Sequence, residues 1–250
     1  MQVTFPSHHV WLKDISEAID TNFSGRAAKK INASLPLLSD AGVTYSIKPL
    51  NAAFFVDFSP LYTQNIGSKR NSLLVDIQAK TLNNRESMFP YFCLSVSEND
   101  NFIGGTIFSF RTDRVSFAYR TFTNEWITAK LKASPALIGE YLIAGFASRH
   151  GKKFLSHGKD RNPYGLNTAI GLAGFKLFVG CSPSVGVVGT YEIRTLDTDK
   201  ITEDCFVLEL PKEGRAITKA YLVTSPENLE KYIQVTKYPD QLTVEVLFRK

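Results

Sequence analysis

The densest group of residues that could do chemistry follows a short apolar stretch at positions 154 to 157. His157, Lys159, Asp160 and Arg161 lie within five positions of one another. This density predicts an acid, a base and phosphate-binding groups at the end of one strand. An imidazole can take a proton from an attacking amine, because the ordinary pKa of histidine is close to neutral pH. Purely structural alternatives stay open: His157 would hydrogen-bond a backbone carbonyl, Asp160 would cap the loop, and Arg161 would be a solvated charge.

Two further charged residues lie on predicted helices. Lys176 is surrounded by the apolar residues of the run FKLFV, so its amine either snorkels to water or points into a polar cleft. Glu140 lies in the first turns of an earlier helix, where a carboxylate could activate an amine. Most charged residues on a helix face are solvated, so a surface role for Glu140 stays open. Cys181 has no histidine or acid at a motif spacing and is interpreted as a small core residue.

The start of the earlier helix is a candidate anion site. Ser134 is a good N-cap and Pro135 suits the first helical position. The exposed N–H groups and the positive end of the helix dipole favour a phosphate, and Lys130 and Lys132 add positive charge. A pantetheine pyrophosphate or a tRNA 3′ end would suit this position. The alternative is a capped helix flanked by two solvated lysines.

Several common catalytic signatures are absent from the sequence. It contains no GxGxxG after a strand, no GxxxxGK[ST], no GxSxG and no HExxH, which excludes the usual nucleotide, hydrolase and zinc-protease motifs. The three cysteines are odd in number and far apart, so they predict neither a disulfide framework nor a zinc site. We therefore expect no metal.

Composition bounds the class of protein. The chain has 250 residues, of which 44% are hydrophobic and 21% charged, so it can bury a sizeable core and is not disordered. No apolar run is long enough to span a membrane, and the first residues do not match a signal peptide. We expect a cytoplasmic protein. The net charge of +5 suggests an anionic partner such as a nucleotide cofactor, RNA or a membrane surface.

Periodicity predicts the elements that position these residues. Residues 8 to 38 are interpreted as helical, 43 to 47 as a strand and 51 to 66 as a helix. Three strands at 91 to 96, 102 to 110 and 115 to 122 predict an antiparallel meander. It is followed by a helix at 135 to 150, a strand at 154 to 157 and a helix at 166 to 178, and this last helix stops at Gly180. Later strands are expected at 187 to 196, 205 to 210, 220 to 223 and 242 to 248, with a short helix at 226 to 234. The class is α/β or α+β with a mixed sheet. We expect an N-terminal helical region (1 to 40), a core (41 to 185) and a β-rich extension of the same domain (186 to 250).

The order of these motifs resembles the GNAT superfamily of acyltransferases. The resemblance covers about residues 43 to 185 and rests on the strand FIGGTIF, the return strand VSFAYRTF, the helix SPALIGEYLIAGFASRHGKKF, the loop SHGKD and the ending GLAGFKLFVG. It is closest to the branch of the Fem-type aminoacyltransferases and related polysaccharide or antibiotic N-acyltransferases. Phe175, Lys176 and Gly180 match the ending of that branch. The glycine-rich pyrophosphate loop of ordinary GNAT enzymes is replaced by NEWITAKLKASP, and their tyrosine acid by Lys176.

The resemblance implies an N-acyltransferase. It implies an acyl-CoA or an aminoacyl-tRNA as the expected donor and a small-molecule amine as the expected acceptor. The resemblance places the lysine of the Phe-Lys pair beside the acyl group, where a cation can stabilise an oxyanion. We assign catalytic roles to Lys176, His157 and Glu140, and donor binding to Lys130, Lys132, Ser134, Lys159 and Arg161. The alternative is a non-catalytic GNAT-like module that binds an anionic ligand or a protein; tRNA, an acyl carrier and a homodimer stay open as partners.

Overall fold

The computed structural model describes residues 2–6, 9–17, 23–67, 74–82, 88–123, 131–159, 170–185, 193–197 and 200–249. The chain forms two compact units. Asp14–Leu155 make a continuous unit, which we call the central unit, and Met1–Lys13 with Ser156–Lys250 make the split unit. This grouping differs from the expected sequential boundaries after residues 40 and 185, because strands at residues 2–13 pair with strands at residues 182–197 within the split unit.

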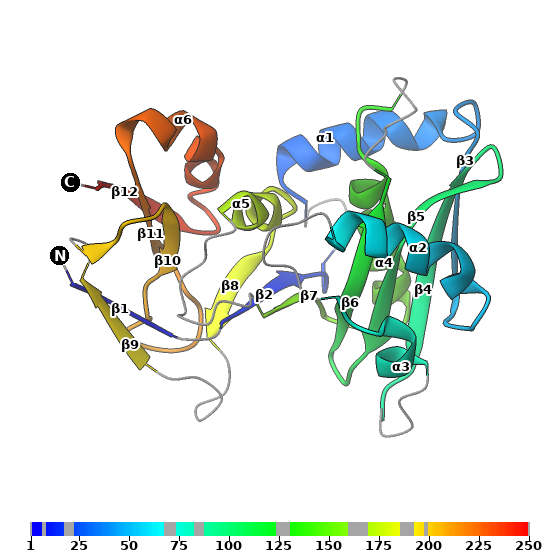
Figure 1. Cartoon of the computed structure of the whole chain (residues 1–250), viewed down its shortest axis with the longest axis horizontal. Coiled ribbons are helices and arrows are strands. Elements are labelled where there is room, and N and C mark those ends of the chain that lie inside the picture. The colour runs from blue at the N-terminus through cyan, green and yellow to red at the C-terminus, as the bar shows by residue number, and fades with distance from the viewer. Residues whose placement is uncertain are drawn as a thin grey trace. The chain divides into compact units, whose positions relative to one another are not determined.

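The central unit is built on an antiparallel meander (Figure 1). Its strands pair in chain order: β3 (Val43–Pro49), β4 (Tyr91–Glu98), β5 (Asn101–Phe110) and β6 (Arg114–Phe122). The two residues between β4 and β5, Asn99 and Asp100, have φ of 47° and 66°. Two successive left-handed residues make the tight turn that matches the twist of a hairpin, and asparagine and aspartate tolerate this conformation. The predicted meander is confirmed.

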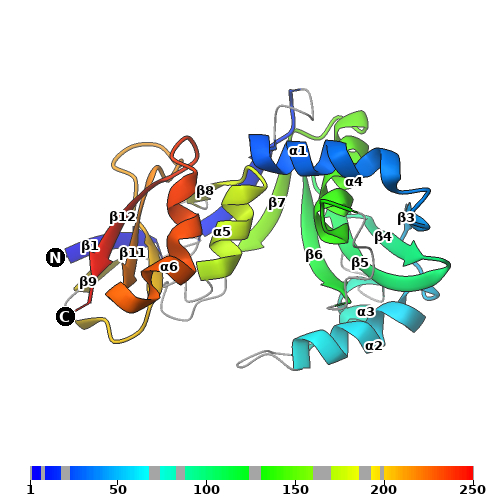
Figure 2. The ribbon, with the colours of Figure 1, turned by 90° about the horizontal axis from the view of Figure 1, so that it is seen from above.

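Helices cover both faces of this sheet (Figure 2). The central unit contains α1 (Gly25–Ser34) with a short 3-10 turn η2 (Leu35–Leu37), α2 (Phe54–Gly67), α3 (Ile77–Thr81) and α4 (Pro135–Arg149). Cys93 on β4 belongs to the core against α2, whereas its neighbour Leu94 lies beside Gly139 of α4. Successive residues of a strand point to opposite faces, so α2 and α4 lie on opposite sides of the sheet.

The helix after the meander leads into a parallel crossover. Ser134 is the N-cap of α4 and Pro135 its first residue, as predicted. After α4, the backbone N–H groups of Lys153 and Phe154 donate to the carbonyl of Asp113, at 2.8 and 3.3 Å. The strand β7 (Phe154–Lys159) therefore begins beside the start of β6, which is the parallel arrangement expected for a strand–helix–strand crossover.

The split unit combines short sheets with helices. β1 (Gln2–Pro6) pairs with β9 (Ile193–Asp197), β2 (His9–Asp14) pairs with β8 (Ser182–Val185), and both pairs are antiparallel. A separate three-stranded sheet has the order β10 (Cys205–Leu208), β11 (Lys219–Thr224) and β12 (Thr243–Phe248). The helical elements are α5 (Ile170–Phe178), α6 (Leu229–Tyr232) and the 3-10 turns η4 (Pro226–Asn228) and η5 (Ile233–Lys237). Both units mix helices and strands, so the chain is a mixed α/β protein.

One element prediction needs correction, and another is described only in part. The helical interpretation of residues 8 to 38 is wrong at β2, where burial alternates from His9 through Trp11 to Lys13 as it does on a strand. Of the strand predicted at 187 to 196, residues 193 to 196 lie in β9, and residues 187–192 lie outside the described ranges. Within the described residues, no helix is long and apolar enough to cross a bilayer.

Candidate functional site

Lys176 is buried on α5. Only 2% of the residue is exposed, and it shares the buried face of the helix with Ile170, Ala173 and Leu177. Its Nζ lies 5.4 Å from the centroid of the Trp11 ring on β2, which is within the range of a cation–π interaction. The snorkelling alternative is therefore wrong, because the structure keeps this ammonium group away from water.

The end of α5 is fixed by a glycine and by a second buried lysine. Gly180 has φ of 90°, its N–H donates to the carbonyl of Leu177, and the N–H of Cys181 donates to the carbonyl of Lys176. This is the left-handed cap that the sequence predicts. Lys13, which is fully buried on β2, donates from Nζ to the carbonyl of Val179. A cation at the carbonyl end of a helix is favourable to the helix dipole. Our sequence interpretation missed Lys13, although its place in the alternating pattern of β2 was a signal.

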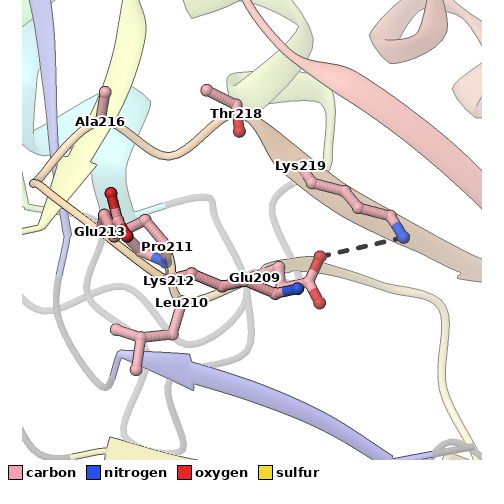
Figure 3. A pocket seen from close by; sticks show the side chains of 8 residues that line it. All are labelled: Glu209, Leu210, Pro211, Lys212, Glu213, Ala216, Thr218 and Lys219. Atoms are coloured by element: carbon pink, nitrogen blue, oxygen red, sulfur yellow. Dashed lines mark ion pairs between the residues drawn. The ribbon is translucent and has the colours of Figure 1, made fainter.

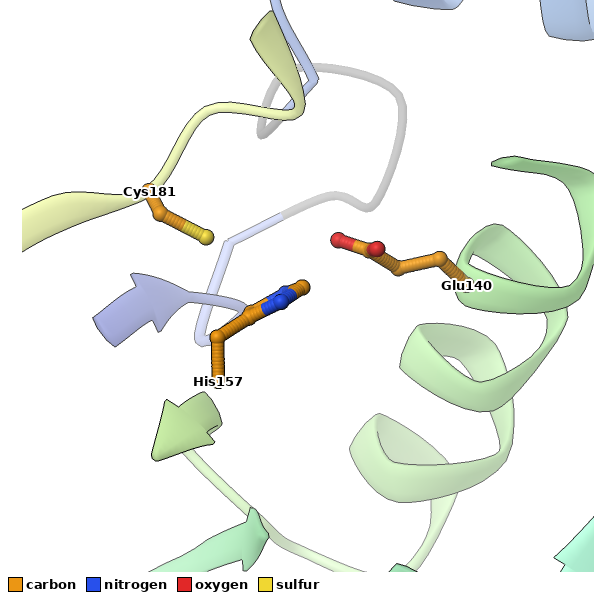
Figure 4. A group of neighbouring side chains, drawn as sticks. All are labelled: Glu140, His157 and Cys181. Carbon is orange, nitrogen blue, oxygen red and sulfur yellow. The ribbon is translucent and has the colours of Figure 1, made fainter. Parts of the chain in front are cut away.

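His157 and Cys181 lie side by side in the split unit (Figure 4). The reactive side-chain atoms of this pair lie within 4.8 Å of each other. His157 is partly buried on β7, and Cys181 is fully buried just after α5. The two residues are far apart in sequence and match no motif, so their proximity could not be predicted. The full burial of Cys181 confirms its interpretation as a small core residue, and the structure adds that its thiol lies beside an imidazole.

Glu140 forms a buried ion pair within the central unit. Its side chain on α4 is fully buried, and Oε2 lies 3.3 Å from Nη1 of Arg120 on β6. The Arg120 side chain is 23% exposed and lies over the ring of Phe117. The solvated alternative for Glu140 is therefore wrong. Arg120 was not identified from the sequence, and the available signal was a cation inside a strand followed by an acid on the next helix.

The start of α4 is held by hydroxyl groups. Ser134 Oγ accepts from the N–H of Leu137 at 3.3 Å. Ser34, which is buried at the end of α1, accepts from the N–H groups of Lys132 and Ala133 at 2.9 and 2.8 Å. Pro135 has no N–H to offer. Several donors around this helix start are thus already occupied, so an anion here would depend mainly on side chains such as the exposed Lys132.

Three predicted donor-binding residues are not placed by the structure. Lys130 and Arg161 lie outside the described residues, as does Asp160. Lys159 ends β7, and its side chain is not described. Their assignment to donor binding stays a prediction.

A surface pocket of the split unit holds none of the predicted site residues (Figure 3). It has a volume of about 450 Å³ and is formed by the segment that joins β10 to β11, with Glu209, Lys212, Glu213 and Lys219 among its lining residues. Nζ of Lys219 lies 3.9 Å from Glu209 and 3.1 Å from Glu245. Hydrogen bonds to Tyr221 and Glu245 raise the pKa of this lysine, so it stays charged within its ion pairs. This arrangement is typical of a charged surface.

Comparison with known proteins gives a likeness of fold. Neither the protein-family models nor the curated proteins give a match. Among solved structures, FemX matches with a TM-score of 0.51 and 14% identity, over 72% of this chain and 60% of the FemX chain. L-PGS from Bacillus licheniformis matches with a TM-score of 0.46 and 12% identity, over 73% of this chain and 59% of its own. A tandem GNAT protein from the clavulanic acid biosynthesis pathway matches with a TM-score of 0.42 and 10% identity, over 72% of this chain and 50% of its own. Of these three structures, FemX alone reaches a TM-score above 0.5, and it shows the likeness of fold.

Proposed function

Because the chain has a GNAT-like fold similar to that of FemX, we propose that it is an N-acyltransferase. It would move an acyl group from an acyl-CoA, or from an aminoacyl-tRNA, to a small-molecule amine. The observation that carries this proposal is the burial of Lys176 in the Phe-Lys ending that resembles the Fem-type branch. A buried ammonium group would stabilise the negative charge that develops on the acyl carbonyl oxygen in the transition state.

The proposed reaction needs two groups of the split unit. The acceptor nitrogen attacks the acyl carbonyl carbon, and the carbonyl oxygen gains a negative charge that Lys176 stabilises. His157 takes the proton that leaves the nitrogen. The tetrahedral intermediate then collapses with cleavage of the bond between the acyl carbon and the donor's sulfur or oxygen, and His157 returns its proton to the leaving CoA thiolate or tRNA ribose oxygen. His157 is only partly buried, so a substrate amine could reach it.

Glu140 has a different proposed role from the one first considered. Glu140 is fully buried and its carboxylate is held by the guanidinium of Arg120. We therefore propose a positioning role for Glu140 within the central unit in place of a role as base. Arg120 would then be a positioning residue for Glu140.

Donor binding is proposed for the basic residues near the start of α4 and the end of β7. Lys130 and Lys132 of the central unit would neutralise phosphates of CoA or of a tRNA 3′ end, and Lys159 and Arg161 of the split unit are proposed for the same kind of contact. Ser134 would contribute through the helix that it caps. Because neighbouring backbone N–H groups are occupied by Ser34 and Ser134, this mode would differ from a glycine-rich loop that binds phosphate through its backbone.

A ligand-binding assay followed by a product search tests the proposal. Thermal unfolding would be followed with acetyl-CoA, longer acyl-CoAs and aminoacyl-tRNA, because a donor that binds the folded state raises the melting temperature. Desulfo-CoA and uncharged tRNA show whether the acyl group adds to binding. Candidate amines would then be incubated with the stabilising donor, and the acylated amine measured by mass spectrometry. We expect one donor class to stabilise the protein and to yield an amide.

The non-catalytic alternative predicts a different outcome. Stabilisation by a donor without any acylated amine would indicate a GNAT-like module that binds an anionic ligand. No stabilisation by any of the three donor classes would contradict the acyltransferase proposal and leave a protein-binding module.

A further inference from the structure

The face of β4 that points toward α2 carries unusually small, polar side chains. Along this strand Leu94 and Val96 are fully buried on the α4 side, whereas Ser95 and Ser97 alternate with them and are half-buried on the α2 side. In the strand register Ser95 lies opposite Ser46 on β3 and opposite Gly105 on β5. Small residues therefore meet on three adjacent strands, and they leave the sheet surface hollow there.

The first turn of α2 forms the wall of this hollow. A Cβ at Gly105 would lie 2.6 Å from the backbone oxygen of Leu94 and 2.9 Å from the ring of Phe54, so only glycine lets the ring pack this closely. Phe54 contacts Phe102 edge to face, with ring centroids 6.1 Å apart. Asn51 accepts from the N–H of Phe54 through its side chain and so fixes the start of the helix.

The result is a polar pocket of about 480 Å³ in the central unit. This volume is within the usual range for sites that bind small molecules. Its polar lining consists of two hydroxyls, two amides, two carboxylates and one ammonium group: Ser95, Ser97, Asn51, Asn101, Asp57, Asp100 and Lys48. Phe54, Phe102, Ala53 and Cys93 complete the lining. Burial raises the pKa of the Cys93 thiol to about 11, so this part of the lining is neutral at physiological pH.

We propose that this pocket binds a neutral, hydroxyl-rich ring of the size of a monosaccharide. Short side chains that both donate and accept can pair with several hydroxyls, and the two phenylalanine rings offer an apolar surface to the C–H face of a sugar. Two aspartates against one lysine disfavour a phosphate or another anion. None of the lining residues belongs to the proposed acyl-transfer machinery, so this inference stands independently of it.

The stability of the sheet supports a functional reason for the two serines. Strands favour β-branched side chains, and a valine at Ser95 or Ser97 would fill the hollow with apolar surface. A fold selected only for stability would gain from that exchange. Positions at which local preference is set aside are expected at functional sites.

Amide chemical shifts of the full chain, labelled with 15N, test the proposal with D-glucose, D-galactose and D-mannose as probes. We expect at least one sugar to shift the amides of Ser95, Ser97 and Asn101 saturably, with a Kd on the order of 1–10 mM. Inorganic phosphate is the comparison ligand and should leave these amides unchanged. Absence of a saturable shift with all three sugars up to about 50 mM would overturn the proposal, as would shifts confined to other residues. Saturable binding of phosphate at these amides would overturn the assigned ligand class.

A pair of matched variants separates binding from folding. Ser95→Val combined with Ser97→Val should weaken sugar binding at least about 10-fold while the melting temperature stays equal or rises. Ser116→Val on β6 changes a half-buried strand serine outside the pocket and should leave sugar binding unchanged. If the double variant is folded and binds the sugar as the original chain does, the pocket is not the site. If the double variant fails to fold, Asn101→Ala at the start of β5 must show the weakened sugar binding instead.

Discussion

Lys176 and Glu140 show how far a sequence can locate a buried charge. The helical period places Lys176 on the same side of α5 as Ala173 and Leu177, so its direction was predictable. Its burial was not, because a lysine at such a position usually reaches water through its flexible stem. The partner of Glu140 could not be predicted either, since Arg120 comes from a strand whose register with α4 is set by packing.

Replacement of the buried lysine tests its catalytic role. Lys176→Met keeps much of the length of the side chain and removes its charge. We therefore expect kcat to fall about 100-fold with little change in KM. The melting temperature should stay the same or rise, because a methionine suits an apolar helix face. Steady-state kinetics measure the effect, with the donor that raises the melting temperature in the binding assay. Lys29→Met on the exposed face of α1 is the control. Full turnover in Lys176→Met would remove this residue from the mechanism.

The ion pair between Arg120 and Glu140 predicts a strong non-additivity. Arg120→Gln leaves a buried carboxylate without its cation and should lower the free energy of unfolding by about 3 kcal/mol. Glu140→Gln in the same chain should restore much of this loss, because the buried charge is then removed. Urea denaturation of both single variants and the double variant gives the coupling energy. Additive effects would show that the two side chains do not interact in solution.

At the scale of elements, sequence patterns predicted the structure correctly where a single short segment determines it. The Ser-Pro start of α4, the glycine end of α5 and the hairpins of the meander were predicted because caps and turns depend on neighbouring residues. The strand β2 was missed, since its six residues alternate too briefly to outweigh a helical interpretation of the region. The helix α3 was missed for a similar reason, because five residues show little periodicity.

The contact between α1 and the start of α4 is a tertiary device that no local pattern reveals. Ser34→Ala would leave the N–H groups of Lys132 and Ala133 without their acceptor and should lower the free energy of unfolding by about 2 kcal/mol. The start of α4 should also loosen, which faster amide hydrogen exchange at residues 132 and 133 would report. Ser39→Ala, at an exposed position just beyond α1, is the matched control. Equal stability of the two variants would contradict this role of Ser34.

For the whole molecule, each unit carries a buried thiol with a raised pKa. Burial raises the pKa of Cys93 in the central unit to about 11 and, with help from Asp204, that of Cys205 in the split unit to about 12, from an ordinary value of 9.0. The unfolded chain therefore loses these protons at lower pH than the folded chain does. Stability should be constant with respect to both thiols below pH 9 and should fall as pH rises above that value.

The measurement is the free energy of unfolding between pH 8 and about 10.5, compared with that of Cys93→Ala and Cys205→Ala. Each variant should lose stability at all pH values, because a buried group is removed, but should show a shallower decline above pH 9 than the original chain. Parallel declines in all three proteins would mean that the thiols are not protected by burial.

The pairing of β1 with β9 has a consequence for synthesis on the ribosome. The first strand emerges early, yet its partner residues 193–197 are made only after the entire central unit has been completed. The continuous central unit has all its strands available once residue 155 has emerged. The backbone groups of residues 2–6 that bond β9 have no partner strand until residues 193–197 have emerged. Nascent chains stalled at successive lengths should therefore resist proteases first in the central unit, and the N-terminal strand should gain protection only after residue 197 has left the exit tunnel.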